Sequence, residues 1–391
     1  MKKLFLLLMT MVILMVPFNF VLAEEGLAKT SKSAILMEAS TGEIIFEKNA
    51  HEKYAPASMT KMMTMLLVVE AIKNKVIDWE DIVTASENAS SMGGSQILLE
   101  TGEKMSVRDL FKGVAIASGN DASVALAEYL YGTEEAFVSM MNKRSKELGM
   151  KNTNFKNVHG LDEANHYSTA YDLAILAREL VKYDEVLKYT SIYEDYLRID
   201  TPRKIWLVNT NKLVRFYDGV DGLKTGHTAE AGYCLTATAK KDNTRFIAVV
   251  MGLDDSKTRN AEVSEMLNFA FAQYQTEQLL SKDSVLGTVE VEKGKKKYVD
   301  VVPTEDVTVL NKKGMQKKNV TYEIEIEKIK APIKKGDIVG ELLLKEDDEV
   351  IRRINITVIE GVDKANFLEL YFRYLTDIFT GDIKLNNRSI K

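Results

Sequence analysis

Apolar and polar positions follow two different periods along this chain, and the changes between them divide it into segments. Short apolar runs on either side of a Ser-Thr-Gly turn predict an antiparallel hairpin over residues 32–48. Apolar positions at helical spacing after residue 58 predict a helix that is apolar on most sides, and therefore central and buried. Further helices are expected at 107–117, 121–131, 134–148 and 169–183.

The strand period returns from Trp206 onward. Residues 221–226 lead into a predicted antiparallel hairpin, 232–239 and 245–251, with its turn at 240–243. A closing helix is expected over Val263–Tyr274. Since the helical stretch lies between β elements, the pattern predicts an α+β domain.

The last part of the chain has two further patterns. Residues 276–360 carry short alternating runs such as Thr321–Glu327, which predict a small β-sandwich without a catalytic cluster. Residues Val362–Thr380 form an amphipathic pattern rich in aromatic residues, which is typical of a helix lying in a membrane surface. The alternative is a helix packed on the β-sandwich. A membrane-spanning helix is not expected, because polar residues recur every few positions.

The N-terminus has the pattern of a secretory signal peptide. Two lysines precede the apolar run Leu4–Val16, and Val21-Leu22-Ala23 supplies small residues before a cleavage site. A retained membrane anchor is the alternative. The predicted division is a signal peptide, a catalytic domain, a β domain and an anchoring helix with its tail, at residues 1–23, 24–275, 276–360 and 361–391. We expect the mature protein outside the cytoplasmic membrane, peripherally attached to its outer face.

Composition narrows the possible functions. The 391 residues are 46% hydrophobic and 28% charged, which is enough for packed cores. The net charge of −5 gives no reason to expect a nucleic-acid partner. Cys234 is the single cysteine, so no intramolecular disulfide can form, and we expect a buried, inert thiol. The four histidines are scattered along the chain without the spacing of a metal site, so a metal enzyme is not expected.

Ser58 is followed three residues later by Lys61, within Pro56-Ala-Ser-Met-Thr-Lys. In a helix these two side chains lie one turn apart on the same face, so the amine can reach the hydroxyl. A hydroxyl is a weak nucleophile until an adjacent base takes its proton. Pro56 suits a helix entry, which would place Ser58 near the helix N-terminus. A pattern this short also occurs on ordinary surface helices.

Two further motifs follow in order, Ser118-Gly119-Asn120 and Lys224-Thr225-Gly226. Ser118 lies at a predicted break between helices, where a loop can project side chains into a cleft. A competing match, Ser86-Glu-Asn88, lies in a polar loop close behind the first motif and is rejected.

The ordered triplet resembles the penicilloyl-serine transferase group, whose motifs are S-x-x-K, S-x-N and K-T-G. The surrounding segments 224–233 and 168–173 are similar to the low-molecular-weight penicillin-binding proteins, which are serine-type D-alanyl-D-alanine carboxypeptidases. The resemblance implies a β-lactamase/transpeptidase-like catalytic domain, an antiparallel sheet with flanking helices and an α-helical subdomain. A small β domain and an amphipathic C-terminal anchor would follow.

The resemblance implies roles for the motif residues. Ser58 would attack the carbonyl between two terminal D-alanines and form an acyl-enzyme, with Lys61 as general base. Lys61 must then be neutral part of the time, and burial and the cation Lys224 both lower its pKa. Ser118 would relay a proton to the leaving D-alanine nitrogen, and Asn120 would hold the substrate's peptide amide.

The resemblance also implies how substrate is held at the strand. Lys224 and Thr225 would grip the terminal carboxylate, and Gly226 lets the backbone approach the ligand closely. Backbone N–H groups of Ser58 and His227 would form the oxyanion hole. Arg259 would add positive charge near the carboxylate, with a surface salt bridge as the alternative.

The function implied is removal of the terminal D-alanine from peptidoglycan pentapeptides, without metal or organic cofactor and with covalent inhibition by β-lactam antibiotics. Two alternatives stay open, a β-lactamase-like hydrolase and a non-catalytic protein that binds the cell wall. The catalytic domain of a β-lactamase normally stands alone, so residues 276–391 argue against the first. An intact motif set argues against the second.

Overall fold

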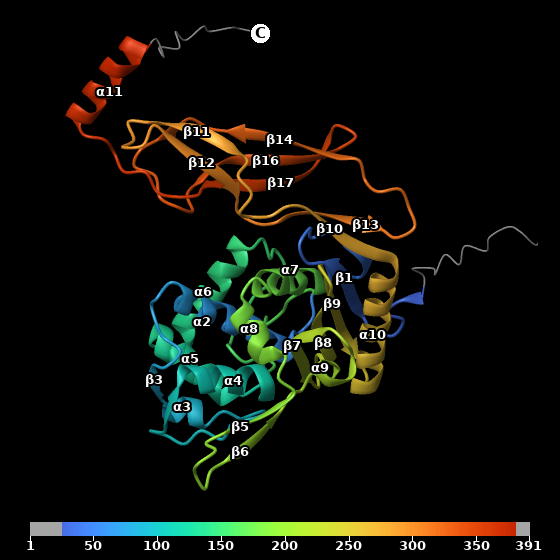
Figure 1. Ribbon diagram of the computed structural model, residues 1–391. Coiled ribbons are helices and arrows are strands. Elements are labelled where there is room, and N and C mark those ends of the chain that lie inside the picture. The colour runs from blue at the N-terminus through green and yellow to red at the C-terminus, as the bar shows by residue number, and fades with distance from the viewer. Residues whose placement is uncertain (1–25, 381–391) are drawn as a thin grey trace, which may run out of the picture.

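A five-stranded antiparallel sheet forms the centre of the N-terminal part of the molecule, in the order β2-β1-β9-β8-β7 (Figure 1). The structure is a computed structural model and describes residues 26–380, so the predicted signal peptide lies outside the described residues. The strands are β1 (Ser33–Glu38), β2 (Ile44–Lys48), β7 (Val220–Thr228), β8 (Gly232–Lys241) and β9 (Thr244–Leu253).

Alternation along the strands gives this sheet two buried faces. On β1, Ala34 and Leu36 point to one face, where they pack with α10 (Ser256–Gln273). Ile35 and Met37 point to the other face and belong to the same core as the methionines of α2 (Lys61–Lys73). The predicted hairpins are observed, and the turn between β8 and β9 is at Asp242-Asn243.

The helical part lies beside the sheet on the α2 side (Figure 1). Ser106 caps the expected helix at 107–117, because its hydroxyl accepts the N–H of Asp109. The helices are α3 (Glu87–Ser90), α4 (Val107–Ala117), α5 (Asn120–Tyr131), α6 (Glu134–Glu147), α7 (Ala170–Leu180), α8 (Asp184–Thr190) and α9 (Leu213–Phe216). Two short hairpins complete this part, β3 (Ile82–Thr84) with β4 (Lys104–Ser106) and β5 (Glu194–Leu197) with β6 (Ile205–Val208).

Three predicted boundaries were wrong. Ser58 lies in a 3₁₀ turn, η2 (Ala57–Thr60), and not in the α-helix that follows it. Helix α10 begins at Ser256 instead of Val263, because Asp255 caps it and its first turns are polar. The C-terminal helix α11 (Phe367–Thr380) begins five residues later than predicted, since Val362 forms a β-bridge with Ile333 and is buried in the C-terminal core.

The C-terminal part is a two-layer β structure, as predicted. A six-stranded sheet in the order β14-β16-β17-β12-β11-β15 packs on the pair β10-β13. The strands are β10 (Tyr274–Leu280), β11 (Gly287–Glu292), β12 (Tyr298–Pro303), β13 (Val307–Lys312), β14 (Val320–Ile326), β15 (Ile329–Lys330), β16 (Ile338–Glu346) and β17 (Glu349–Val358). Helix α11 extends from this part (Figure 1). No helix within residues 26–380 is long and apolar enough to cross a membrane.

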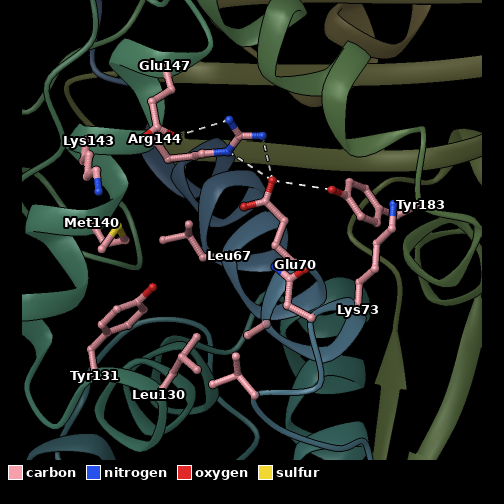
Figure 2. Close-up of a pocket in the computed structure, with 13 residues that line it drawn as sticks. Leu67, Glu70, Lys73, Leu130, Tyr131, Met140, Lys143, Arg144, Glu147 and Tyr183 are labelled. Carbon is pink, nitrogen blue, oxygen red and sulfur yellow. Dashed lines mark hydrogen bonds and ion pairs between the residues drawn. The ribbon is translucent and has the colours of Figure 1, made fainter. Parts of the chain in front are cut away.

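The far end of α2 from Ser58 is fixed by a charged cluster (Figure 2). Glu70 accepts two N–H groups of Arg144, at 2.7 and 3.0 Å, and Arg144 also contacts Glu179 at 3.2 Å. The cluster borders a cavity of about 520 Å³ that contains no motif residue. Because α2 also carries Lys61, these contacts position the helix that enters the site.

We predict that Glu70→Ala lowers the free energy of unfolding by about 2 kcal/mol, because a partly buried guanidinium loses two charged hydrogen bonds. Glu147→Ala is the matched control. It removes a more exposed carboxylate, 3.4 Å from Arg144, and should change stability by less than about 0.5 kcal/mol. Urea unfolding followed by circular dichroism measures both, and equal losses would contradict this account of the cluster.

Candidate active site

The turn that carries Ser58 is held in an unusual backbone conformation. Ala57 has a φ of 47°, and the N–H of Met59 bonds to the carbonyl of Pro56 at 3.1 Å. Gly160 packs directly on this turn, since a Cβ there would lie 1.9 Å from the carbonyl oxygen of Ala57. Ala57 and Met59 are buried, whereas Ser58 is only half-buried and so keeps access to solvent.

Lys61 is fully buried behind Ser58, and three oxygens surround its amine. Nζ lies 3.0 Å from Ser58 Oγ, 2.6 Å from Asn120 Oδ1 and 2.6 Å from the backbone oxygen of His159. Burial, and then the charge of Lys224, lower the pKa of Lys61 well below its usual value. The predicted pairing of these side chains across one turn is therefore present.

A neutral Lys61 has a defined orientation among these oxygens. The carbonyl of His159 and Asn120 Oδ1 can only accept, so they take the two N–H groups of a neutral amine. The Asn120 amide cannot be flipped, because its Nδ2 donates to the carbonyl of Gly93 at 2.7 Å. The amine lone pair is then left for Ser58, whose hydroxyl can donate. The geometry is that of a base aimed at a nucleophile.

Ser118 lies where α4 ends and α5 begins, as the sequence predicted. It adopts a left-handed conformation with φ 64° and ψ 32°. The side chain is buried, yet its hydroxyl has no hydrogen-bond partner within residues 26–380. Because an unpaired buried hydroxyl costs free energy, this atom is the one most in need of a partner from a ligand.

Lys224 and Thr225 lie on β7, the edge strand of the sheet. Lys224 is buried and its Nζ bonds to the carbonyl of Thr225 at 3.2 Å. Burial and then the charge of Arg259 lower the pKa of Lys224 to about 7. Thr225 Oγ1 lies 2.7 Å from Thr210 Oγ1.

Gly226 and His227 continue this strand past the Ser58 turn. A Cβ at Gly226 would lie 2.8 Å from the carbonyl oxygen of Pro56, so only glycine allows the strand to lie this close. The His227 side chain is exposed and its ring packs at a tilt of 34° against Tyr233, with 4.0 Å between centroids.

Arg259 is not at the surface. It lies in the first turns of α10, is 5% exposed, and its guanidinium bonds to Asn260 Oδ1 at 2.9 and 3.1 Å. It forms no ion pair within the described part of the chain, so the alternative of a surface salt bridge was wrong. After burial, the charge of Arg259 is the second cause that lowers the pKa of Lys224.

Two sequence features have structural roles. Ser86 caps α3, and Asn88 bonds to Glu128, so the rejected second match takes no part in the site. Cys234 is fully buried and burial raises its pKa to about 11, which agrees with the inert thiol expected. No group of three potential metal ligands among His, Cys, Asp and Glu occurs in residues 26–380.

Sequence reasoning missed the segment 151–169, which closes one side of the site. It supplies the His159 carbonyl and Gly160, and also His166, whose ring nitrogen lies 2.8 Å from Thr60 Oγ1. Burial lowers the pKa of His166 to about 4, so it stays neutral at ordinary pH. Since a backbone carbonyl and a close-packed glycine carry no side-chain signature, no motif could have indicated them.

The α+β fold with its β-rich C-terminal domain is that of the penicillin-binding proteins. The chain belongs to the D-alanyl-D-alanine carboxypeptidase family, which it matches over residues 21–255. Residues 274–364 match the penicillin-binding protein 5 C-terminal domain. The family and fold predicted from the three motifs are therefore confirmed.

Several relatives match across both domains. D-alanyl-D-alanine carboxypeptidase DacF of Bacillus subtilis is 53% identical over 352 residues, which is 90% of each chain. DacC of Escherichia coli is 36% identical over 86% of this chain and 85% of its own. The crystal structure of penicillin-binding protein 5 from Haemophilus influenzae aligns with a TM-score of 0.68 at 35% identity, over 86% of this chain and 98% of that one.

We predict that Gly226→Ala slows acylation of Ser58 by a β-lactam by roughly 100-fold, because the added Cβ pushes β7 away from the nucleophile turn. Gly287→Ala is the control, since no atom of residues 26–380 outside its immediate chain neighbours lies within 4 Å of its Cβ position. Stopped-flow measurement with a fluorescent penicillin compares the two. Acylation at the wild-type rate in Gly226→Ala would contradict the close approach.

Proposed function

We propose that this protein is a serine-type D-Ala-D-Ala carboxypeptidase that removes the terminal D-alanine from peptidoglycan pentapeptides through an acyl-enzyme on Ser58. The observation that carries the proposal is the buried Lys61 amine, which lies 3.0 Å from Ser58 Oγ and 2.6 Å from each of two oxygens that can only accept. In its neutral form those oxygens take both N–H groups, which leaves the lone pair for the Ser58 hydroxyl. Relatives in Bacillus subtilis, Escherichia coli, Haemophilus influenzae and Salmonella typhimurium all bear the name D-alanyl-D-alanine carboxypeptidase.

Acylation begins when Ser58 Oγ attacks the penultimate D-alanine carbonyl while its proton moves to Lys61 Nζ. The backbone N–H groups of Ser58 and His227 stabilise the oxyanion of the tetrahedral intermediate. When the intermediate collapses, the C–N bond breaks, and the proton passes through the Ser118 hydroxyl to the leaving D-alanine nitrogen. The Ser118 hydroxyl supports this relay, because it has no hydrogen-bond partner among the residues that the structure describes.

Deacylation uses the same groups with water as the nucleophile. Lys61 takes a proton from water, the hydroxide attacks the ester, and Ser58 recovers its proton as the C–O bond breaks. The products are free D-alanine and a peptide one residue shorter, without a cofactor.

Substrate is held through its carboxylate and its peptide amide. The cations Lys224 and Arg259, with the Thr225 hydroxyl, bind the terminal carboxylate. Since Lys224 has a pKa of about 7 without ligand, the arriving carboxylate favours its protonated form. One N–H of Asn120 Nδ2 bonds to Gly93, which leaves the second for the substrate's peptide carbonyl.

β-Lactam antibiotics acylate Ser58 in the same way, because they present a strained amide and a carboxylate together. Penicillin-binding protein D2 of Listeria monocytogenes was solved in cefotaxime-bound and ampicillin-bound forms. Those structures align with a TM-score of 0.56 at 32% identity, over 62% of this chain and 97% of that one.

The test is a paired assay of the 24–391 chain with a D-Ala-D-Ala peptide and with a penicillin. We expect release of D-alanine and a long-lived penicilloyl adduct, and Ser58→Ala should abolish both. Ser86→Ala, in the rejected motif, should leave both unchanged. Fast turnover of penicillin would indicate a β-lactamase, and intact binding without D-alanine release would indicate a non-catalytic wall protein.

We also propose the predicted division of the chain, with export by residues 1–23, a catalytic domain at 24–275, a β domain at 276–360 and membrane attachment by 361–391. Helix α11 supports attachment, since six of its large apolar side chains are half to four-fifths exposed, from 50% at Tyr371 to 79% at Phe367, while Leu370 and Leu375 are partly buried. Two of its polar residues contact the β domain: Asp377 pairs with Lys297 at 2.9 Å, and Arg373 donates to the backbone carbonyl of Lys295 at 2.8 Å. The apolar side is then free to enter the outer leaflet.

We predict that Phe367→Ser with Phe372→Ser lowers binding to phospholipid vesicles by at least tenfold, because each buried aromatic contributes about 1.5–3 kcal/mol. The matched control is Ile199→Ser with Phe216→Ser, which removes exposed apolar side chains from the N-terminal part. Co-sedimentation with vesicles measures binding, and D-alanine release should be unchanged in solution. Equal binding of both double variants would rule out α11 as the anchor.

A truncation that removes the proposed anchor should begin after Ala365, because Val362 and Ala365 belong to the folded β part.

A further inference from the structure

Asp121 is a buried carboxylate directly after the second motif, and none of the three motifs includes it. It is 1% exposed, and its partners are backbone amides instead of cations. Oδ1 accepts the N–H groups of Ile97 at 3.0 Å and Ala122 at 2.8 Å, and Oδ2 accepts that of Leu99 at 3.0 Å. An ionised carboxylate bound in this way forms strong hydrogen bonds.

These bonds hold the segment 93–99 against the start of α5. The carbonyl of Ser95 accepts the N–H of Asn120 at 2.7 Å, and the carbonyl of Gly93 accepts its Nδ2 at 2.7 Å. The Gly93 contact is what turns Asn120 Oδ1 toward Lys61. The orientation of the amine therefore depends on a segment that Asp121 fixes in place.

We propose that Asp121 is a positioning residue for the acylation of Ser58. It fixes segment 93–99, and that segment in turn fixes the Asn120 amide. Its negative charge also offsets the effect of the Lys224 charge on Lys61. The proposal rests on the proposed function of Ser58 and Lys61. Asp121 touches neither the nucleophile nor the substrate, so it acts through other residues.

The charges around Lys61 come from three elements. Lys224 on β7 lowers the pKa of Lys61, and Asp121 on α5 raises it. His159, on the segment 151–169, is neutral because burial and Lys61 lower its pKa to about 3. Arg259 stands behind Lys224 and acts on that lysine. Removal of the Asp121 charge should therefore lower the pKa of Lys61 further, so that the base stays neutral at more acid pH.

The experiment measures the rate of acylation by a fluorescent penicillin against pH in the full chain. We expect Asp121→Asn to slow acylation by roughly 100-fold, because the Asn120 amide loses its fixed position. The acid limb of this variant's rate–pH profile, where Lys61 becomes protonated, should move to lower pH. Glu38→Gln is the matched control. Glu38 is also buried and accepts backbone N–H groups, those of Ser40 and Thr41, at the boundary with the β domain. It should lower the melting temperature and leave the acid limb in place.

Asp121→Glu separates the effect of side-chain position from the effect of charge. It also provides a second test if Asp121→Asn does not fold. Its longer side chain should slow acylation by at least tenfold, while the retained charge keeps the acid limb at its wild-type pH. An unmoved acid limb in Asp121→Asn, or wild-type acylation in Asp121→Glu, would overturn the proposal. Absence of acylation in the wild-type chain would instead overturn the proposed function, so the two failures are distinguishable.

Discussion

The site depends on one constraint, that a fully buried amine has two oxygens that can only accept and one that can donate. Burial removes the water that would solvate an ammonium at Lys61, and Lys224 adds repulsion, so the neutral form is favoured. Asn120 Oδ1 and the His159 carbonyl then take both N–H groups. The lone pair has one remaining direction, toward Ser58. Orientation and protonation of the base thus have the same physical origin.

The scaffold meets this constraint by bringing separate elements unusually close together. Helix α2 carries Lys61 into the core with its polar end fixed at Glu70, and β7 brings Lys224 to the edge of the sheet. Gly160 and Gly226 both lie against the Ser58 turn, where an added Cβ would meet its backbone atoms. Such contacts exclude water and limit movement of the turn, which favours a preorganised nucleophile.

The sequence predicted those parts that reside in side chains with distinctive chemistry. The order of the motifs led to Ser58, Lys61 and Ser118, and the structure brings the Ser58 and Lys61 side chains within 3.0 Å. It did not predict the His159 carbonyl, since a backbone oxygen leaves no trace in residue type. Nor did it predict Asp121, which looks like any acidic residue in a first helical turn. Helix α10 was predicted too short because its first turns lack an apolar period, and the structure shows that the Asp255 cap sets its start at Ser256.

The most direct measurement is the titration of Lys61 itself, followed by NMR of the chain with ¹³Cε-labelled lysine and assigned by comparison with Lys61→Arg. We expect a pKa for Lys61 well below the ordinary lysine value of about 10.4. Replacement of Lys224 by methionine should raise it, since the largest neighbouring positive charge is removed. An ordinary pKa for Lys61, unaffected by Lys224, would show that the amine is a protonated cation in the resting enzyme and would contradict its assignment as the base.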